Sequence, residues 1–255
     1  VIPSRHLGLS IDETFCFDAF ADRVAEVIDK TVNVDRLLEL CTVEFSGEQT
    51  GGVICSGNRK IAIARDEAFN FMYRENVEAL KRAGEVVFFS PLRDKSLPEA
   101  DMVYFPGGYP ELHLAELAAN EGMRQSVRKY CENGGRVLAE CGGMMYLCDT
   151  ITDGDGKVYP MAGVLKQGAT MEQMKLKLGY REVRVNGQRI RGHEFHYSRI
   201  LPANEKIPVI GTIYNAKDMV VDTPVYTYKN VLASYIHFYW GECGIDHFLM
   251  LMSQK

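Results

Sequence analysis

The sequence contains 255 residues, 46% of them hydrophobic and 25% charged, with a net charge of −5 at pH 7. These values are typical of a globular chain with room for one large α/β domain, or for one domain and an appendage. The acidic balance and the scattered basic residues argue against a nucleic-acid or anionic-membrane partner, and no apolar run approaches the roughly 20 residues that span a bilayer.

The cysteines and the first residues indicate the compartment. The seven cysteines are widely spaced and include no C-x-x-C pair, which favours free thiols in a reducing cytosol. No signal peptide opens the chain, so we expect a cytoplasmic protein without a membrane partner. Because the first residue is Val1 rather than Met, we expect the sequence to be part of a longer chain.

The first 50 residues predict a separate segment. Apolar residues at helical spacing predict one or two amphipathic helices between residues 17 and 40, and residues 47–57, rich in Gly, Ser and Thr, predict a linker. Gly52 and Gly57 have the spacing of a phosphate-binding loop. However, Asn58 and Arg59 stand where Gly-Lys-Ser/Thr is required, so we expect no P-loop in this sequence.

From residue 60 onward, short apolar strands alternate with helical patterns. Strands are predicted at 61–64, 86–89, 102–105 and 137–139, and helices at 70–83, 111–119 and 123–132. This alternation predicts an α/β fold with a doubly wound, mostly parallel sheet and ligands at the carboxyl ends of its strands. After residue 152 strands and turns predominate, at 179–185, 190–197, 209–214 and 224–240, followed by a last helix at 245–252.

Cys141 lies between the predicted strand at 137–139 and a helical run at 144–148. Ala139 and Gly143, two residues on either side, are small enough for a nucleophile elbow, in which the backbone reverses sharply beneath an exposed side chain. The helix N-terminus is expected to favour the thiolate, which is the reactive species. The alternative is a buried core cysteine, and the elbow context favours the nucleophile.

A cysteine nucleophile needs a base, which is usually histidine. His237 is the best candidate, because it ends a predicted strand late in the chain that could pack beside the elbow strand, although the spacing fits a hydrogen-bonded core histidine equally well. The glycines after the strand at 102–105, Gly107 and Gly108, could bring backbone N–H groups to an oxyanion, with the N–H of Gly142 as the second donor. An ordinary Pro-Gly turn is the alternative.

Two other motifs resemble metal sites, but each lacks a feature that metal binding requires. His193 and His196 are three residues apart, so on a strand they point to opposite faces, and they do not form an H-E-x-x-H motif. Residues 153–157 (Asp-Gly-Asp-Gly-Lys) begin like a calcium loop but lack its later ligands, and we predict a hairpin turn there. We therefore expect no metal ligands in this chain.

Four segments in order resemble the cobyrinic acid a,c-diamide synthase family: Pro-Gly-Gly-Tyr-Pro-Glu at 106–111, Glu-Cys-Gly-Gly at 140–143, Gly-His-Glu-Phe-His-Tyr-Ser at 192–198 and Ser-Tyr-Ile-His at 234–237. The match is to the C-terminal, class I-like glutamine amidotransferase domain of that family, from about residue 60 to the end. Residues 5–9 resemble the end of its ATP-binding module. The resemblance implies the tail of that module and a linker at 1–50, and a flavodoxin-like amidotransferase domain at 51–255. Other class I enzymes carry His-x-Glu, whereas Phe238 and Tyr239 follow His237, as in the cobyrinate-type branch.

The resemblance also implies the chemistry. Cys141 would attack the side chain of glutamine, Gly107, Gly108 and Gly142 would hold the oxyanion, and His237 would transfer protons. Ammonia would then pass to a tetrapyrrole carboxylate activated with ATP and Mg²⁺ by a synthetase module that precedes this sequence, so no cofactor is expected in this chain itself. The implied partners are glutamine, that module and, through it, the tetrapyrrole.

Three alternatives remain open at this point. The tetrapyrrole could be nickel-sirohydrochlorin, the chain could be a stand-alone elbow-cysteine hydrolase or peptidase, or it could be a non-catalytic binding module. We expect residues 190–198 to have a structural or domain-interface role, apart from the cysteine machinery.

Overall fold

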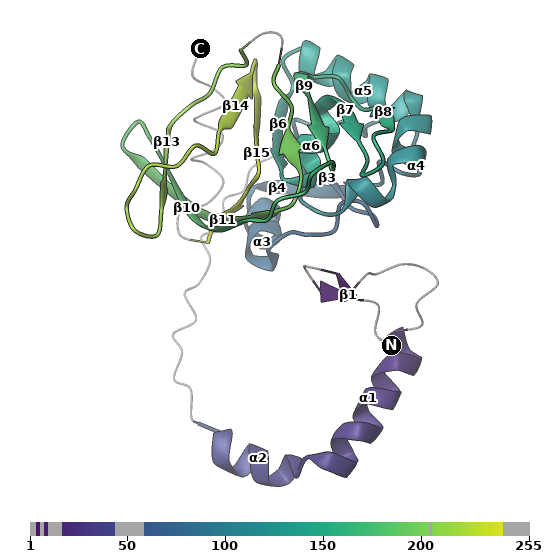
Figure 1. Ribbon diagram of the computed structural model, residues 1–255, viewed down its shortest axis with the longest axis vertical. Coiled ribbons are helices and arrows are strands. Elements are labelled where there is room, and N and C mark those ends of the chain that lie inside the picture. The colour runs from purple at the N-terminus through teal and green to yellow at the C-terminus, as the bar shows by residue number, and fades with distance from the viewer. Residues whose placement is uncertain (1–3, 6–7, 10–16, 44–58, 204–205, 242–255) are drawn as a thin grey trace. The chain divides into compact units, whose positions relative to one another are not determined.

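The computed structural model describes residues 4–5, 8–9, 17–43, 59–203 and 206–241 (Figure 1). The chain forms two compact units, Val1–Val53 and Ile54–Lys255. The linker at 47–57 and the helix at 245–252 that the sequence predicts lie outside the described residues. Within the described part of the chain, no helix combines the length and the apolar character that a membrane crossing requires.

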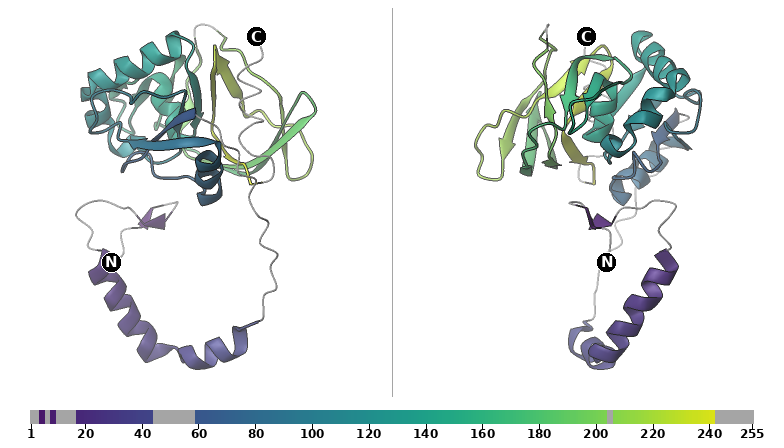
Figure 2. Two further views of the ribbon diagram at one scale, coloured as in Figure 1. Left: turned by 180° about the vertical axis from the view of Figure 1, so that it is seen from behind. Right: turned by 45° about the vertical axis from the view of Figure 1, so that its right-hand side comes forward.

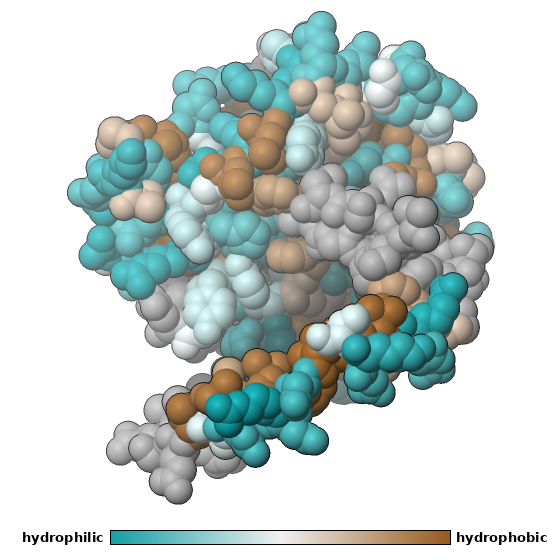
Figure 3. Space-filling view, turned by 60° about the horizontal axis from the view of Figure 1, so that its bottom comes forward, coloured by the Kyte–Doolittle hydropathy of each residue, from teal (hydrophilic) through white to brown (hydrophobic). Residues whose placement is uncertain are grey.

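Where the sequence predicts one or two amphipathic helices, the first unit contains two, α1 (Phe17–Thr31) and α2 (Val34–Cys41). It also contains a short antiparallel pair, β1 (Ser4–Arg5) with β2 (Gly8–Leu9). The side chain of Asn33 caps α2 by accepting a hydrogen bond of 2.9 Å from the N–H of Arg36. Apolar side chains run along both helices and are exposed, as Figure 3 shows.

The second unit is built on a six-stranded sheet in the order β14-β15-β6-β5-β3-β4. Five strands are parallel: β3 (Arg59–Ala64), β4 (Gly84–Phe89), β5 (Met102–Phe105), β6 (Arg136–Glu140) and β15 (Val231–Ser234). Only the edge strand β14 (Val225–Tyr228) runs antiparallel. The predicted doubly wound, mostly parallel sheet is confirmed.

Alternate residues of the central strands feed two separate cores. On β3, Ala62 and Ala64 pack with the helices α4 (Leu114–Ala119), α5 (Glu121–Glu132) and α6 (Gly142–Leu147). Ile61 and Ile63 point the other way, toward α3 (Arg74–Ala83) and a second sheet. This second sheet is antiparallel, in the order β13-β10-β11-β16, and lies on the opposite side of the main sheet from α4 and α5 (Figure 2).

The second sheet consists of β10 (Lys177–Val185), β11 (Gln188–His196), β13 (Thr212–Asn215) and β16 (Ile236–Tyr239). A third, mixed sheet holds β7 (Cys148–Thr152), β8 (Val158–Pro160), β9 (Leu165–Thr170) and β12 (Arg199–Ile200). The hairpin turn predicted at 153–157 joins β7 to β8, where Asp153 Oδ1 accepts hydrogen bonds from the N–H groups of Asp155 and Lys157. The helical run expected through Cys148 ends at Leu147 instead, because Cys148 begins β7.

Candidate active site

Cys141 occupies a strained turn between β6 and α6. Its φ is 47° and its ψ is −107°, a backbone conformation that residues other than glycine rarely adopt. The N–H of Cys141 donates a hydrogen bond of 2.8 Å to the carbonyl of Ser234, which fastens the turn to the end of β15. A Cβ on Gly143 would lie 2.3 Å from the carbonyl oxygen of Phe105. A side chain at position 143 would therefore clash with the backbone, and a nucleophile elbow requires a small residue at this position.

The glycine loop at 106–110 lies against this elbow. The carbonyl of Pro106 accepts a hydrogen bond of 3.1 Å from the N–H of Gly143. The nitrogen of Gly108 lies 3.2 Å from the place that a Cβ on Gly142 would occupy. In the described part of the chain, the N–H of Gly108 donates no hydrogen bond to a backbone carbonyl. This geometry brings the N–H of Gly108 beside the elbow, as an oxyanion hole requires.

His237 reaches the same place from the neighbouring strand. Ser234 on β15 lies opposite Glu140 on β6, and His237 follows three residues later as the second residue of β16, rather than at the end of a strand. The side chain of His237 is 1% exposed, and a Cβ on Gly107 would lie 2.3 Å from its Cε1. The glycine loop therefore contacts both the elbow and the imidazole.

The imidazole of His237 is held by ring contacts. Neither ring nitrogen has a hydrogen-bond partner among the described residues. The ring stacks on that of His193 at a centroid distance of 4.8 Å and meets Phe71 edge-to-face at 4.6 Å. Burial, assisted by the nearby histidines, lowers the pKa of His237 to about 3, so the ring is neutral at pH 7.

His193 belongs to this site, contrary to the expectation that residues 190–198 lie apart from the cysteine machinery. It is the direct cross-strand neighbour of His237, and its Nδ1 lies 2.7 Å from the hydroxyl of Tyr73. Burial lowers the pKa of His193 as well. The sequence carried one usable signal: on β11, alternate residues face the same side, so His193 faces away from His196.

His196 takes part in a different network. Its Nε2 lies 2.7 Å from Oε1 of Glu194, and Glu194 also accepts hydrogen bonds of 2.7 Å from Arg181 and Thr223. Burial alone would raise the pKa of Glu194, but the bonds from His196 and Thr223 outweigh it and hold that pKa at about 2. Within the described ranges, no three His, Cys, Asp or Glu side chains are grouped to hold a metal ion.

Glu140, directly before the elbow, is a site residue that sequence reasoning missed. It is 1% exposed, accepts a hydrogen bond of 2.8 Å from the hydroxyl of Tyr104, and accepts one of 3.2 Å from the N–H of Phe238. Burial raises its pKa to about 8. Glu140 therefore joins the strand that carries Cys141 to the strand that carries His237, and at pH 7 it is mostly an uncharged acid.

The surroundings of Cys141 favour the thiol, whereas the sequence analysis expects them to favour the thiolate. Burial raises its pKa, the negative charge of Glu111 raises it further, and the N–H of Gly142 is the group that opposes this. The N–H of Gly142 belongs to the first residue of the predicted helix beneath the thiol, α6, and its hydrogen bond does not offset the burial. The site therefore pairs a neutral thiol with a neutral imidazole.

The fold and this arrangement define a class I type glutamine amidotransferase domain, with a cysteine elbow on a parallel sheet and a histidine after the adjacent strand. Residues 60–243 match the CobB/CobQ-like glutamine amidotransferase domain, and the chain belongs to this family.

Two curated relatives match almost the whole chain. Hydrogenobyrinate a,c-diamide synthase of Pseudomonas aeruginosa is 38% identical over 240 residues, covering 93% of this chain and 54% of that protein. Cobyrinate a,c-diamide synthase of Salmonella typhimurium is 34% identical over 256 residues, covering 94% of this chain and 56% of that protein. The chain thus spans little more than half the length of these relatives. A solved glutamine amidotransferase aligns with a TM-score of 0.48 at 23% identity, covering 76% of this chain and 99% of that one.

Proposed function

We propose that this chain hydrolyses glutamine and supplies the ammonia to an ATP-dependent synthetase that amidates a tetrapyrrole carboxylate, as in cobyrinate a,c-diamide synthesis. The observation that carries the proposal is the convergence of a strained, buried Cys141 and a neutral His237 on one glycine loop. The names of the relatives support the choice of acceptor. Free thiols at Cys131, Cys141 and Cys148 support a cytoplasmic location.

In the proposed first step, the sulfur of Cys141 bonds to the side-chain carbonyl carbon of glutamine as its proton passes to His237. The carbonyl oxygen becomes an oxyanion, which accepts hydrogen bonds from the N–H groups of Gly142 and of the Gly107–Gly108 loop. The C–N bond then breaks, and the nitrogen takes the proton from His237 and leaves as ammonia. A thioester between Cys141 and the glutamyl group remains.

In the second step, His237 takes a proton from a water molecule whose oxygen attacks the thioester carbon. The C–S bond breaks, glutamate leaves, and the proton returns to the sulfur of Cys141. His237 thus acts as base and then as acid in the first step, and as base and then as acid again in the second. The stacked ring of His193, fixed by Tyr73, holds the imidazole plane in place of the carboxylate that normally orients a catalytic histidine.

The proton equilibrium predicts slow hydrolysis by the chain alone. The raised pKa of Cys141 and the lowered pKa of His237 both oppose transfer of the thiol proton to the imidazole in the empty site. We therefore expect the rate of ammonia release to rise when the synthetase half docks and changes the surroundings of these groups. ATP and Mg²⁺ are assigned to that half, and titration of this chain with Mg-ATP in a calorimeter should give no heat of binding.

The test is to measure glutamate and ammonia released from glutamine by this chain, alone and with the ATP-binding half of the same protein, Mg-ATP and the tetrapyrrole. Cobyrinic acid and hydrogenobyrinic acid should both be offered, because relatives named for each match this chain. Mass spectrometry of the tetrapyrrole would detect the new amides. Absence of glutamate in every mixture would contradict the proposal, and full-rate hydrolysis by the chain alone would contradict the dependence on docking.

A further inference from the structure

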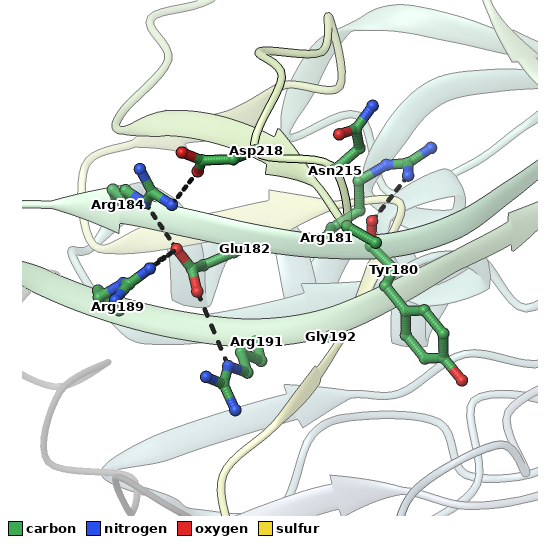
Figure 4. Close-up of a pocket in the computed structure, with 10 residues that line it drawn as sticks. Tyr180, Arg181, Glu182, Arg184, Arg189, Arg191, Gly192, Asn215 and Asp218 are labelled. Carbon is green, nitrogen blue, oxygen red and sulfur yellow. Dashed lines mark hydrogen bonds and ion pairs between the residues drawn. The ribbon is translucent and has the colours of Figure 1, made fainter.

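β16, the strand that carries His237, is the last strand of the second sheet and pairs with β11 along one edge. The sheet behind that edge is tied by ion pairs: Glu182 on β10 accepts hydrogen bonds of 2.8 Å from Arg189 on β11 and of 2.6 Å from Arg184 (Figure 4). In the part of the chain that the structure describes, no strand pairs with the other edge of β16. The buried backbone groups on that edge therefore need other partners.

Two buried side chains supply these partners. Backbone groups of successive residues alternate between the two edges of an antiparallel strand, and those of Phe238, directly after His237, point away from β11. The N–H of Phe238 donates a hydrogen bond of 3.2 Å to Oε1 of Glu140, and its carbonyl accepts one of 2.7 Å from Nδ2 of Asn76. Oδ1 of Asn76 also accepts a hydrogen bond of 2.9 Å from the N–H of Trp240. The amide of Asn76 thus takes the place of one residue of a neighbouring strand.

Asn76 lies on a helix that is itself fixed in the core. It is the third residue of α3 and is fully buried. Leu80, one helical turn later, packs in the core between the main sheet and the second sheet. The residues just before α3 reach the rest of the site: the N–H of Phe71 donates a hydrogen bond of 3.0 Å to the carbonyl of Gly107, and the ring of Phe71 meets that of His237. One continuous segment, 71–76, therefore contacts the glycine loop, the imidazole and the strand that carries it.

We infer that Asn76 is a positioning residue for glutamine hydrolysis, which fixes the backbone beside His237 and, through it, the place of the imidazole. The inference rests on the proposed function. Neither ring nitrogen of His237 has a hydrogen-bond partner among the described residues, so the ring is placed by its ring contacts and by its backbone. Without Asn76, two buried backbone groups would lose their partners, and Glu140 would remain as the side chain that holds Phe238 on that edge. A shift of about 1 Å in a catalytic group costs about 10²-fold in rate.

The test uses the complete protein with the substitution Asn76→Leu, which nearly keeps the volume of the side chain and removes both hydrogen bonds. The matched control is Asn120→Leu, because Asn120, directly before α5, is also buried and donates hydrogen bonds of 2.8 Å to the carbonyls of Pro91 and Asp94. Both variants should unfold at a lower temperature, since each loses two buried hydrogen bonds. We expect kcat for glutamate formation to fall at least about tenfold in Asn76→Leu alone, with the KM for glutamine changed less than about twofold.

A second measurement asks whether Asn76 acts through His237. The rate at which a glutamine-analogue electrophile alkylates Cys141 should fall in Asn76→Leu, because His237 takes the thiol proton. The same substitution should have no further effect in a protein that already carries His237→Ala. If the leucine variant does not fold, Asn76→Ala gives the same comparison, because it leaves room for a water molecule at the freed backbone groups.

Three results would overturn the positioning role. They are an unchanged kcat in a folded Asn76 variant, an equal loss of kcat in Asn120→Leu, and an equal fall in the alkylation rate with and without His237→Ala. If the unaltered protein forms no glutamate from glutamine, the proposed function itself fails, and the positioning role fails with it.

Discussion

The substitution Gly107→Ala tests whether the glycine loop and His237 form one working site. The added Cβ would lie 2.3 Å from Cε1 and 2.9 Å from Nδ1 of His237, whereas carbon atoms in ordinary contact are about 3.4 to 4 Å apart. The ring would have to retreat by about 1 Å. It has little room, because it stacks on His193 at 4.8 Å and meets Phe71 at 4.6 Å.

The expected loss follows from that displacement. A misplacement of about 1 Å in a catalytic group costs about 10²-fold in rate, and overpacking of a filled core costs about 1–3 kcal/mol in the free energy of unfolding. The φ of Gly107 lies outside the left-handed region, so steric contact with the imidazole is the whole perturbation. We therefore expect ammonia release from glutamine to fall by about two powers of ten in a protein that still folds.

The assay compares initial rates of glutamate formation and urea unfolding curves for Gly107→Ala and for Gly154→Ala. Gly154 is a suitable control because a Cβ there would meet nothing within 4 Å. The control should keep the unaltered rate and midpoint. A folded Gly107→Ala protein with an undiminished rate would refute the reasoning, since either the loop yields or His237 is not the proton carrier.

Three further predictions concern the other residues of the site. Cys141→Ala should abolish glutamate formation, whereas Cys148→Ala should keep most of the activity. A glutamine-analogue electrophile should form a single adduct, detected by mass, on the peptide containing residue 141. Loss of activity only in the Cys148 variant would exclude the elbow assignment. His193→Leu should lower kcat about tenfold with little change in KM, whereas His193→Phe should restore part of it by preserving the stacked ring; equal kcat values in all three proteins would exclude a positioning role. Because burial raises the pKa of Glu140 from 4.5 to about 8, the folded protein binds this proton more tightly than the unfolded chain, so the carboxyl contributes stability below pH 4.5 that is lost as the pH rises toward 8. The free energy of unfolding, measured with urea across this pH range, should fall by up to about 1.4 kcal/mol per pH unit, and Glu140→Gln should remove this dependence. An unchanged pH dependence in that variant would mean that other groups cause it.

The sequence alone determined the features that depend on local pattern. The period of the apolar residues predicts the strands and helices, because burial of one face imposes that period wherever the element packs. The elbow at Cys141 is also local, since the sharp turn admits only small residues at Ala139 and Gly143. His237 was chosen because it ends a predicted strand late in the chain, although the structure makes it the second residue of β16. The glycines at 107 and 108 were identified because a close backbone approach excludes a side chain.

Tertiary structure decided the contacts that join distant strands and the charges that burial controls. His193 meets His237 only because the register of β11 on β16 pairs them, and a shift by one residue would turn His193 to the other face. The hydrogen bond from the N–H of Phe238 to Glu140 joins residues almost one hundred positions apart, so no local sequence pattern predicts it. The pKa of the Cys141 thiol depends on how much water the folded chain excludes, and desolvation outweighs the hydrogen bond from the N–H of Gly142 there.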